Sequence, residues 1–398
     1  MVLHIILDDK FGEIIINRFQ NYSNPINKFV VVNSEKSIQN IPAKFAQKAT
    51  HVHEDNILDF VGSQINNITG IIFHGLNENY KWEIIKRYKG KVHLHWKFWG
   101  TDGYMLPQMR KGLFEKETKK LYLELKNISK FRFYLTNSGG FIYNLYAWQY
   151  KIRNKEDHYL KKLEKAIKSV DSISSVVIDD YYKIKRALNL KAPHLYLYYT
   201  ADGVKNLGIE DNSPTSQNII IGNSAAIVNN HIDAFNKIKN YGISSRKIIV
   251  PLNYGGGNYP GLIERITQRG IEVFKSDNFM PLTQFIEKKE YSKLLSTCSH
   301  AIMNHNKQHA GGNINMLLYI GTKIFLNDKN PIYTFLKRNN IIIFNTKELS
   351  QEQLDTPLSK QEIQHNRTQL MKIYDPQLIE ERHKILMDTL SQQTPASK

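Results

Sequence analysis

The sequence predicts an α/β protein with two domains, each built around a parallel β-sheet. Short runs of β-branched residues alternate with segments of helical periodicity in both halves of the chain, which is typical of βαβ units. The 398 residues are more than one hydrophobic core ordinarily organises. A polar stretch rich in turn-forming residues, 202–217, separates the halves and indicates an interdomain linker.

The first half carries a run of predicted strands and helices before its pattern changes. The strands are expected at Val2–Leu7, Lys28–Asn33, Gly70–Phe73 and Val92–Trp96, and the helices at Asn56–Ile65 and Tyr80–Tyr88. Residues 109–168 then form a lysine-rich helical insertion. We expect residues 1–205, with this insertion included, to form one Rossmann-like domain.

The second half repeats the alternation of strands and helices. Its strands are expected at Asn218–Ile221, Lys247–Val250, Glu272–Phe274, His300–Met303, Lys323–Leu326 and Ile341–Phe344. They predict a second Rossmann-like domain over residues 206–375. Residues 376–390 show helical spacing and precede a polar end, so we expect 376–398 to be a C-terminal helix and tail.

The charge balance predicts anionic partners, because the formal net charge is +17. The basic excess gathers between Arg110 and Lys168, together with aromatic residues such as Tyr146 and Trp148. Helices with basic and apolar faces suit an anionic membrane surface. A solvated helix packed on its own domain explains the same pattern, and the sequence leaves both interpretations open.

The remaining global features point to the cytoplasm. No run of roughly 18 apolar residues predicts a membrane span, and the N-terminus lacks a signal-peptide pattern. The single cysteine, Cys298, excludes a disulfide framework and fits a reducing compartment.

Ligands of open α/β sheets bind at the carboxyl ends of the strands, so the loops after the predicted strands hold the candidate site residues. Trp99, Asp102 and Tyr104 follow the strand that ends at Trp96. Aromatic rings stack on sugar rings, so the two tryptophans, Trp96 and Trp99, beside the carboxylate of Asp102 predict a sugar site. Asp102 is the first candidate for a general base, a role worth about 10²–10⁴-fold in rate, although it also fits a helix cap.

A histidine stands at the end of the preceding predicted strand, in Phe73-His74-Gly75. His74 is the second candidate base, or a phosphate ligand, and a structural role is equally expected. His93 and His95 share one strand face, but no carboxylate or cysteine follows at metal spacing. A zinc site is therefore not predicted.

In the second half, glycines and polar side chains follow the predicted strands. A glycine lets the backbone approach a ligand, and a helix N-terminus supplies donors to phosphate oxygens, so these loops predict a pyrophosphate site. A helix cap with a flexible glycine loop is the alternative. The candidate nucleotide-binding residues are Gly222, Asn223, Ser224, Pro251, Tyr254, Lys307, His309, Gly311, Gly312 and Asn313.

Taken in order, these landmarks resemble the TDP-N-acetylfucosamine:lipid II N-acetylfucosaminyltransferases, also called 4-α-L-fucosyltransferases or glycosyltransferase family 56. The matching stretches are Phe73-His74-Gly75, the Trp-Gly-x-Asp-x-Tyr of 99–104, Gly222-Asn223-Ser224 with Asn230-His231, Val250-Pro251 with Tyr254, and 327–331. No single stretch is decisive, and their order carries the resemblance.

The resemblance implies a GT-B fold, in which two Rossmann-like domains face each other across a cleft. It implies that the N-terminal domain binds the acceptor, with Trp96, Trp99 and Tyr104 as acceptor-binding residues, and that the C-terminal domain binds the nucleotide-sugar donor. The implied reaction moves a (N-acetyl)fucosamine-type sugar from a dTDP-linked donor to an undecaprenyl-pyrophosphate-linked saccharide in cell-surface polysaccharide synthesis. Transfer would invert the anomeric carbon and need neither a metal nor a cofactor.

The resemblance also implies a peripheral protein at the cytoplasmic side of the inner membrane. Two other functions compete with it. One is a GT-B transferase that uses another nucleotide sugar, such as a UDP-linked one, for capsule or lipopolysaccharide. The other is a basic nucleic-acid-binding protein, which we rank low because no RNA-binding or helix-turn-helix signature is present. Nucleic acid is therefore not an expected partner.

Overall fold

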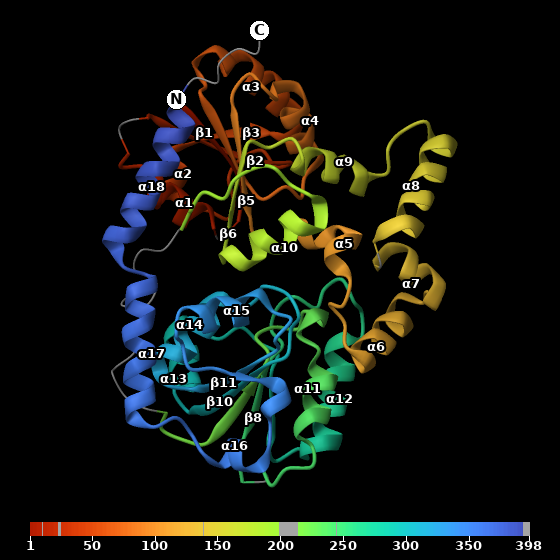
Figure 1. Cartoon of the computed structure of the whole chain (residues 1–398), viewed down its shortest axis with the longest axis vertical. Coiled ribbons are helices and arrows are strands. Elements are labelled where there is room, and N and C mark those ends of the chain that lie inside the picture. Colours follow the sequence, from red (N-terminus) through yellow and green to blue (C-terminus); the bar gives the residue numbers. More distant parts are fainter. Residues whose placement is uncertain (10, 23–24, 138, 199–213, 244, 393–398) are drawn as a thin grey trace. The chain divides into compact units, whose positions relative to one another are not determined.

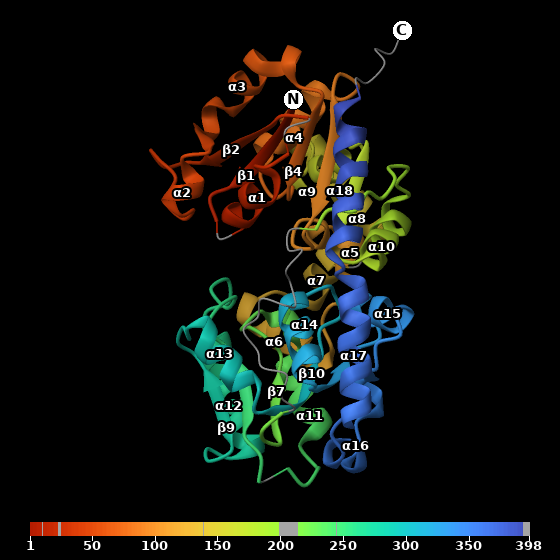
Figure 2. The same cartoon turned by 90° about the vertical axis from the view of Figure 1, so that its left-hand side faces the viewer.

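The computed structural model describes residues 1–9, 11–22, 25–137, 139–198, 214–243 and 245–392. The chain divides into two compact units (Figures 1 and 2), here called the first and the second unit. The first comprises Met1–Arg110, Leu135–Ala201 and Pro376–Lys398, and the second comprises Lys111–Tyr134 and Asp202–Asp375. The predicted boundary after residue 205, the linker over 202–213 and the end of the tail from 393 lie outside the described residues.

The first unit contains a six-stranded sheet in the order β3-β2-β1-β4-β5-β6, with every pair parallel. The strands are β1 (Val2–Leu7), β2 (Asn27–Asn33), β3 (Ala49–His53), β4 (Gly70–His74), β5 (His93–Phe98) and β6 (Ser172–Ser175). The central strands are apolar runs buried on both faces, as parallel strands covered by helices require.

Helices of the first unit surround its sheet, except α8, which lies away from the strands (Figure 1). They are α1 (Gly12–Phe19), α2 (Ala43–Ala46), α3 (Ile57–Gln64), α4 (Asn79–Tyr88), α5 (Pro107–Arg110), α8 (Gly140–Asn154), α9 (Tyr159–Ile167), α10 (Ile178–Leu188) and α18 (Pro376–Ser391). One core joins α1 and α18 to the sheet, with Ile16, Phe19 and Leu386 buried against Val31. The C-terminal helix therefore belongs to the N-terminal sheet.

Sequence periodicity missed two strands of the first unit, β3 and β6. The reason is clearest in β6, whose sequence Ser-Ile-Ser-Ser lacks an apolar run. Its hydroxyls are buried against β5, where Ser172 Oγ lies 2.8 Å from His95 Nδ1 and Ser174 Oγ lies 2.9 Å from His95 Nε2. A polar strand is stable here because the neighbouring strand supplies its hydrogen-bond partners.

The second unit contains another parallel six-stranded sheet, in the order β12-β11-β10-β7-β8-β9. The strands are β7 (Asn218–Ile221), β8 (Ile248–Pro251), β9 (Phe279–Leu282), β10 (Cys298–Met303), β11 (Lys323–Leu326) and β12 (Phe344–Asn345). The helices are α6 (Lys116–Lys126), α11 (His231–Ile238), α12 (Leu262–Phe274), α13 (Lys288–Leu295), α14 (Gly311–Ile320), α15 (Pro331–Arg338), α16 (Gln351–Asp355) and α17 (Lys360–Ile373). The prediction of two parallel α/β domains is confirmed.

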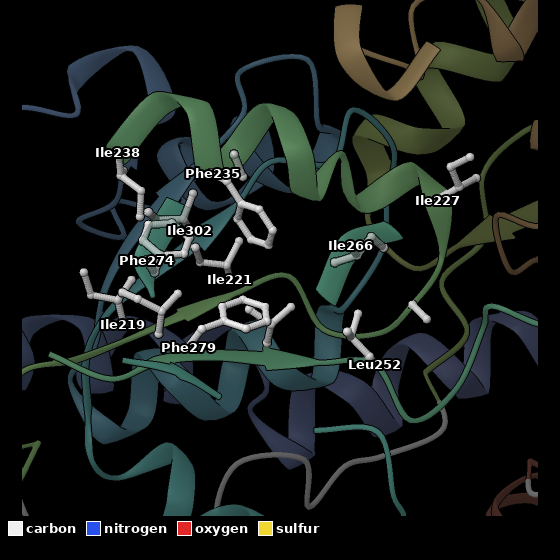
Figure 3. Close-up of a cluster of buried hydrophobic side chains, with 14 of the residues drawn as sticks. Ile219, Ile221, Ile227, Phe235, Ile238, Leu252, Ile266, Phe274, Phe279 and Ile302 are labelled. Atoms are coloured by element: carbon white, nitrogen blue, oxygen red, sulfur yellow. The ribbon is translucent and has the colours of Figure 1, made fainter. Parts of the chain in front are cut away.

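The core of the second unit centres on three phenylalanines (Figure 3). Phe279 of β9 meets Phe235 of α11 edge-on, with ring centroids 5.8 Å apart, and lies 6.2 Å from the ring of Phe274 in α12. Aromatic pairs in these geometries stabilise by about 0.5–1.5 kcal/mol beyond the burial of their area. They fix α11 and α12 on one face of the sheet.

Two strand predictions in the second half need correction. The strand expected at Glu272–Phe274 is wrong, because these residues are the last turn of α12. Leu262, Ile266, Gly270 and Phe274 are all buried, and their spacing of four residues marks one face of a helix. The strand expected at Ile341–Phe344 is reduced to Phe344 and its neighbour in β12.

The lysine-rich insertion is divided between the units, whereas the sequence assigned all of it to the first domain. Its first helix, α6, packs in the second unit because Asp233 caps it: the backbone N–H groups of Glu117 and Thr118 each donate to that carboxylate at 2.9 Å. The short helix α7 (Lys130–Asn137) spans the division between the units, and α8 and α9 belong to the first.

The contact between Gly270 and Phe279 gives a stability prediction. A Cβ at residue 270 would lie closer than 3.0 Å to ring atoms of Phe279, which is buried and has no room to move. We expect Gly270→Ala to lose about 1–3 kcal/mol of unfolding free energy through overpacking, less the gain in helix propensity of roughly 0.5–1 kcal/mol. Denaturant unfolding measures the difference. Gly257→Ala is the control, because a Cβ there meets no atom within 4 Å; equal stability of the two variants would contradict the packing argument.

Candidate active site

Each sheet has one point at which the order of its strands reverses. In the second unit this point lies between β7 and β10, because β8 and β9 extend to one side and β11 and β12 to the other. In the first unit it lies between β1 and β4. Open α/β sheets bind ligands beside such switch points, outside the carboxyl ends of the strands. We call the carboxyl ends of the strands at these two points the first-unit edge and the second-unit edge.

At the second-unit edge, the loop after β7 brings the backbone close to neighbouring side chains. Gly222 has φ of +69°, and a Cβ there would lie 2.7 Å from His231 Nε2, so the position favours glycine on both counts. Next in the chain, Asn223 Nδ2 donates to the hydroxyl of Tyr254 at 3.0 Å. The Tyr254 side chain is 48% exposed, which leaves a ring face for a ligand.

The loop after β10 completes this edge. His309 Nε2 lies 3.3 Å from Ser224 Oγ, and His305 Nε2 lies 3.0 Å from the carbonyl oxygen of His309. Ala310, with φ of +61°, then starts α14 without a side-chain cap. The first N–H groups of this helix, from Gly311 onward, therefore provide donors and a partial positive charge suited to an anion.

The structure thus brings most of the predicted nucleotide-binding residues together. Asn223, Ser224, Tyr254 and His309 are joined by the two hydrogen bonds given above. Lys307 lies on the same loop as His309 and is partly exposed. Pro251 is different, because it is buried in β8 opposite Leu282 and supports the edge without offering a surface.

Sequence reasoning missed a second polar group at this edge. The carboxylate of Glu115 accepts from Asn304 Nδ2 at 3.1 Å and from Asn327 Nδ2 at 2.9 Å, and Lys237 Nζ lies 3.5 Å away. Both asparagines directly follow a buried strand, a signal that sequence reasoning can use. Glu115 carries no such signal, because it reaches the edge from the insertion.

At the first-unit edge, the two candidate bases are both buried. Asp102 Oδ2 accepts from Trp96 Nε1 at 2.7 Å and from the backbone N–H of Leu76 at 3.1 Å, while Oδ1 accepts from the N–H of Gly103 at 3.0 Å. Burial raises the pKa of Asp102, and these hydrogen bonds oppose the rise. The capping role that the sequence left open is therefore observed, and a role as base stays a prediction.

His74 ends β4 and faces another histidine. Its Nε2 lies 3.0 Å from Nδ1 of His4, and the two rings stack with centroids 5.3 Å apart. Burial lowers the pKa of His74, and nearby positive groups, including His4 and Lys81, lower it further. His74 is therefore held neutral, the form in which an imidazole accepts a proton.

The predicted acceptor-binding aromatics differ in their exposure. Trp96 is fully buried, and Tyr104 is buried with its hydroxyl donating to Asp180 at 2.7 Å. Trp99 is partly exposed and packs against Phe11, with ring centroids 4.6 Å apart. Phe11 lies in the loop after β1, so these two rings flank the switch point. Sequence reasoning missed Phe11, although its place after a strand was a usable signal.

A buried lysine also lies near this edge. Lys97 in β5 donates to the carbonyl oxygens of Ser175 and Leu197 at 3.1 and 2.7 Å. Burial lowers its pKa to about 7, against an opposing effect of the Asp102 carboxylate. Sequence reasoning had no signal for this group, because a lysine within a strand ordinarily points to solvent.

The described residues contain neither a metal-binding cluster nor a membrane-spanning helix. No group of three or more histidine, cysteine or carboxylate side chains is placed to hold a metal ion. Within the same residues, every helix is too short or too polar to cross a bilayer.

The chain resembles one family in sequence. The model of a family described as 4-alpha-L-fucosyltransferase glycosyl transferase group 56 matches residues 128–390, more than half of the chain. The matched residues include the loops after β7, β8, β10 and β11 at the second-unit edge, but not the segment around Glu115.

Solved structures resemble the chain over almost its whole length. Anabaena HepE in complex with UDP has a TM-score of 0.61 at 9% identity, with 98% of this chain and 99% of that chain covered. The apo structure of OtsA has a TM-score of 0.61 at 8% identity, with the same coverage. An E. coli protein bound with UDP-2-fluoro glucose has a TM-score of 0.59 at 9% identity, again with 98% and 99% covered. At these identities the likeness shows the fold alone, and it confirms the GT-B prediction.

Proposed function

The chain belongs to the 4-alpha-L-fucosyltransferase family, glycosyltransferase group 56, and from this premise we propose its donor and acceptor. The donor is a dTDP-linked sugar of the (N-acetyl)fucosamine type. The acceptor is an undecaprenyl-pyrophosphate-linked saccharide, and the product enters cell-surface polysaccharide synthesis at the cytoplasmic side of the inner membrane. Transfer inverts the anomeric carbon.

The observation that carries the donor assignment is the second-unit edge. Exposed Tyr254 offers a ring to a nucleotide base, and the uncapped N-terminus of α14 lies beside Lys307 and His309, where a diphosphate needs positive charge. As the sugar leaves, negative charge develops on the diphosphate, and preorganised donors that meet this charge lower the barrier. These side chains and backbone N–H groups fill that role without a metal.

A UDP-linked donor is the second candidate. It is favoured by the solved structures of similar fold, since Anabaena HepE has structures with UDP and with UDP-glucose. The base edge of the nucleotide decides between uracil and thymine, which differ by one methyl group. A hydrophobic contact with one methyl group is worth only about 1–3 kcal/mol, so the base alone discriminates modestly. The two nucleotides also differ at the ribose, because dTDP lacks the 2′-hydroxyl of UDP.

Asp102 is our first candidate for the base that takes the proton of the acceptor hydroxyl, and His74 is the second. Asp102 is fully buried, so an acceptor hydroxyl reaches it only if the groups that cover it move, whereas His74 is already neutral beside His4. Catalytic hydrogen bonds often form only when substrate binds. Trp99 with Phe11 is the aromatic surface that we assign to the acceptor saccharide. Trp96 and Tyr104 are buried, and they bond Asp102 and Asp180.

The membrane contact is assigned to α8. Four apolar residues of this helix lie at spacings of four, three and four, and all are exposed: Phe141 (80%), Leu145 (44%), Trp148 (59%) and Ile152 (61%). Lys151, Arg153 and Lys155 at its C-terminal end are exposed, and of these Lys151 also pairs with Asp157 at 3.2 Å. An apolar stripe bordered by cations suits an anionic bilayer surface.

The neighbouring helix α9 is less suited to this contact. Its apolar side chains, including Leu160 and Leu163, are buried. Its lysines pair with carboxylates of the same unit, as Lys161 and Lys168 do with Glu164 at 2.8 and 2.7 Å. We therefore assign the proposed membrane contact to α8 alone rather than to the whole insertion.

Donor binding is tested by nucleoside diphosphates in a buffer that contains EDTA. We expect dTDP to raise the unfolding temperature, because a ligand at a hundred times its dissociation constant stabilises by about 2.7 kcal/mol. UDP is the comparison, and GDP is the control. The rise in unfolding temperature is expected to be largest with dTDP, smaller with UDP and smallest with GDP. Stabilisation by UDP above dTDP would favour the second candidate, and a requirement for manganese or magnesium would contradict the metal-free site.

The two candidate bases are separated by Asp102→Asn and His74→Ala. We expect Asp102→Asn to lower turnover by ~10²-fold at saturating acceptor, because the amide cannot accept the proton. It also places an amide N–H₂ beside the N–H of Gly103, so stability falls by about 1–3 kcal/mol. Rates are therefore compared below the unfolding transition. A rate defect confined to His74→Ala would move the base to the histidine, and a raised acceptor KM alone would mark a binding residue.

Flotation with vesicles tests the α8 stripe. We expect the wild type to float with phosphatidylglycerol vesicles more than with phosphatidylcholine vesicles. The double variant that carries both Phe141→Ser and Trp148→Ser should lose this binding. Phe285→Ser is the control, because Phe285 is 78% exposed but lies outside α8. Undiminished flotation of the double variant would show that another surface binds.

A further inference from the structure

Three histidines meet beside the switch point of the second sheet. His231 begins α11, His305 follows β10, and His309 precedes α14. The rings of His305 and His309 are nearly perpendicular, with centroids 5.6 Å apart. His309 Nε2 also lies 3.3 Å from Ser224 Oγ, so the cluster joins the loop after β7 to the loop after β10.

Two of these histidines are buried, and each has at least one ring nitrogen without a hydrogen-bond partner among the described residues. His231 is 2% exposed and His305 is fully buried. Among the described residues, neither nitrogen of His231 has a hydrogen-bond partner, and Nδ1 of His305 has none. A buried polar group left unpaired costs about 1–3 kcal/mol, so a native protein that keeps several of them in one place needs a reason.

The unpaired groups face the anion-binding elements described above. His231 Nε2 lies 2.7 Å from where a Cβ of Gly222 would be, so its ring is turned toward the loop after β7. His305 bonds the backbone of His309, which stands immediately before the uncapped N-terminus of α14. The cluster therefore lies behind the place where a diphosphate contacts the helix.

The charges around the cluster keep it neutral when no ligand is bound. Burial lowers the pKa of His231 to about 3 and that of His305 to about 4, and it lowers the pKa of His309 as well. Repulsion from His305 lowers the pKa of His231 further, and repulsion from His305, Lys307 and His231 lowers that of His309. For His305, the hydrogen bond to the backbone of His309 raises the pKa and Lys307 lowers it. Other elements bring two more titratable groups to this edge. The hydroxyl of Tyr254 accepts a hydrogen bond from Asn223, and the carboxylate of Glu115 accepts hydrogen bonds from Asn304 and Asn327.

We propose that His231, His305 and His309 make the donor edge a proton-coupled anion site, in which binding of a nucleoside diphosphate group is accompanied by uptake of one proton by this cluster. The proposal rests on the donor site assigned above and deepens it. His309 is partly exposed and bonded to Ser224, so it contacts the diphosphate. His305 positions the backbone of His309 through its hydrogen bond, and His231 interacts electrostatically with both.

The direction of the pH dependence follows from the charges. A bound diphosphate favours the imidazolium form, so the pKa of the cluster is higher in the complex than in the free protein. The complex then holds more protons than the free protein, and affinity rises as the pH falls. Uptake of a full proton corresponds to a tenfold tighter Kd for each pH unit, by the same linkage that governs stability.

Isothermal titration calorimetry of the full chain tests this proposal with dTDP-glucose and UDP-glucose. A nucleotide sugar is the better probe, because both its phosphates are esterified and the terminal phosphate with a pKa of about 6 is absent. Titrations in two buffers of different ionisation enthalpy count the protons taken up. Because the pKa values of the free cluster lie well below neutral, we expect proton uptake to increase as the pH is lowered from about 8 to about 5.5, and the Kd to fall in parallel.

Variants identify the group that takes up the proton. His309→Gln keeps a polar side chain beside Ser224 but does not titrate, so we expect binding to persist with no proton uptake and a flat pH profile. His300→Gln is the matched control and should behave as wild type: His300 is a buried histidine of β10 whose pKa is also lowered to about 4, but it bonds Ser299 and the carbonyl oxygen of Gln353.

The outcomes separate this proposal from the donor assignment. Binding of either nucleotide sugar by the wild type with no proton uptake and a constant Kd overturns the proton-coupled site and leaves the donor site standing. Loss of uptake in His300→Gln but not in His309→Gln also overturns it. Absence of binding by both probes overturns the donor site together with this proposal. The wild-type measurement needs no variant, so a variant that fails to fold leaves the test intact.

Discussion

Polar side chains buried at the carboxyl ends of the two sheets determine what each edge of this protein can do. A polar or charged group removed from water costs free energy unless it is paired. In the first unit the carboxylate of Asp102 accepts three hydrogen bonds, and Lys97 is held by two carbonyl oxygens. In the second unit His231 stays without a partner among the described residues. Asp102 and Lys97 are therefore paired within the protein, whereas the ring nitrogens of His231 are not paired within the described part of the chain.

The lysine-rich insertion takes part in both units. Its start, around Glu115 and the cap that Asp233 provides for α6, is part of the second unit and reaches the ends of β10 and β11. Its middle, α8, belongs to the first unit and exposes an apolar stripe. A basic segment that appears uniform in composition therefore carries two different physical functions, one in packing and one at the surface.

Low sequence identity to solved structures of the same fold is consistent with how this fold is specified. Parallel strands buried on both faces need only apolar, β-branched residues, and many sequences satisfy that requirement. The side chains at the strand ends are under different constraints, because each must fit one ligand. The fold is therefore shared at about 9% identity, while the chemistry that we propose depends on residues such as Tyr254, His309 and Trp99.

The sequence by itself determined the two parallel sheets and the loops that follow their central strands. It did so because a buried strand such as β1 or β7 is a short apolar run, and a glycine or polar residue directly after it lies at the carboxyl edge of the sheet. Only the tertiary structure decided the membership of β6, whose serines are stable through contacts with His95, 77 and 79 residues away. Likewise it decided that Trp99 is exposed and Trp96 buried, that Phe11 joins Trp99, and that Glu115 reaches Asn304 and Asn327. Burial and pairing depend on partners distant in the chain, and local periodicity carries no information about them.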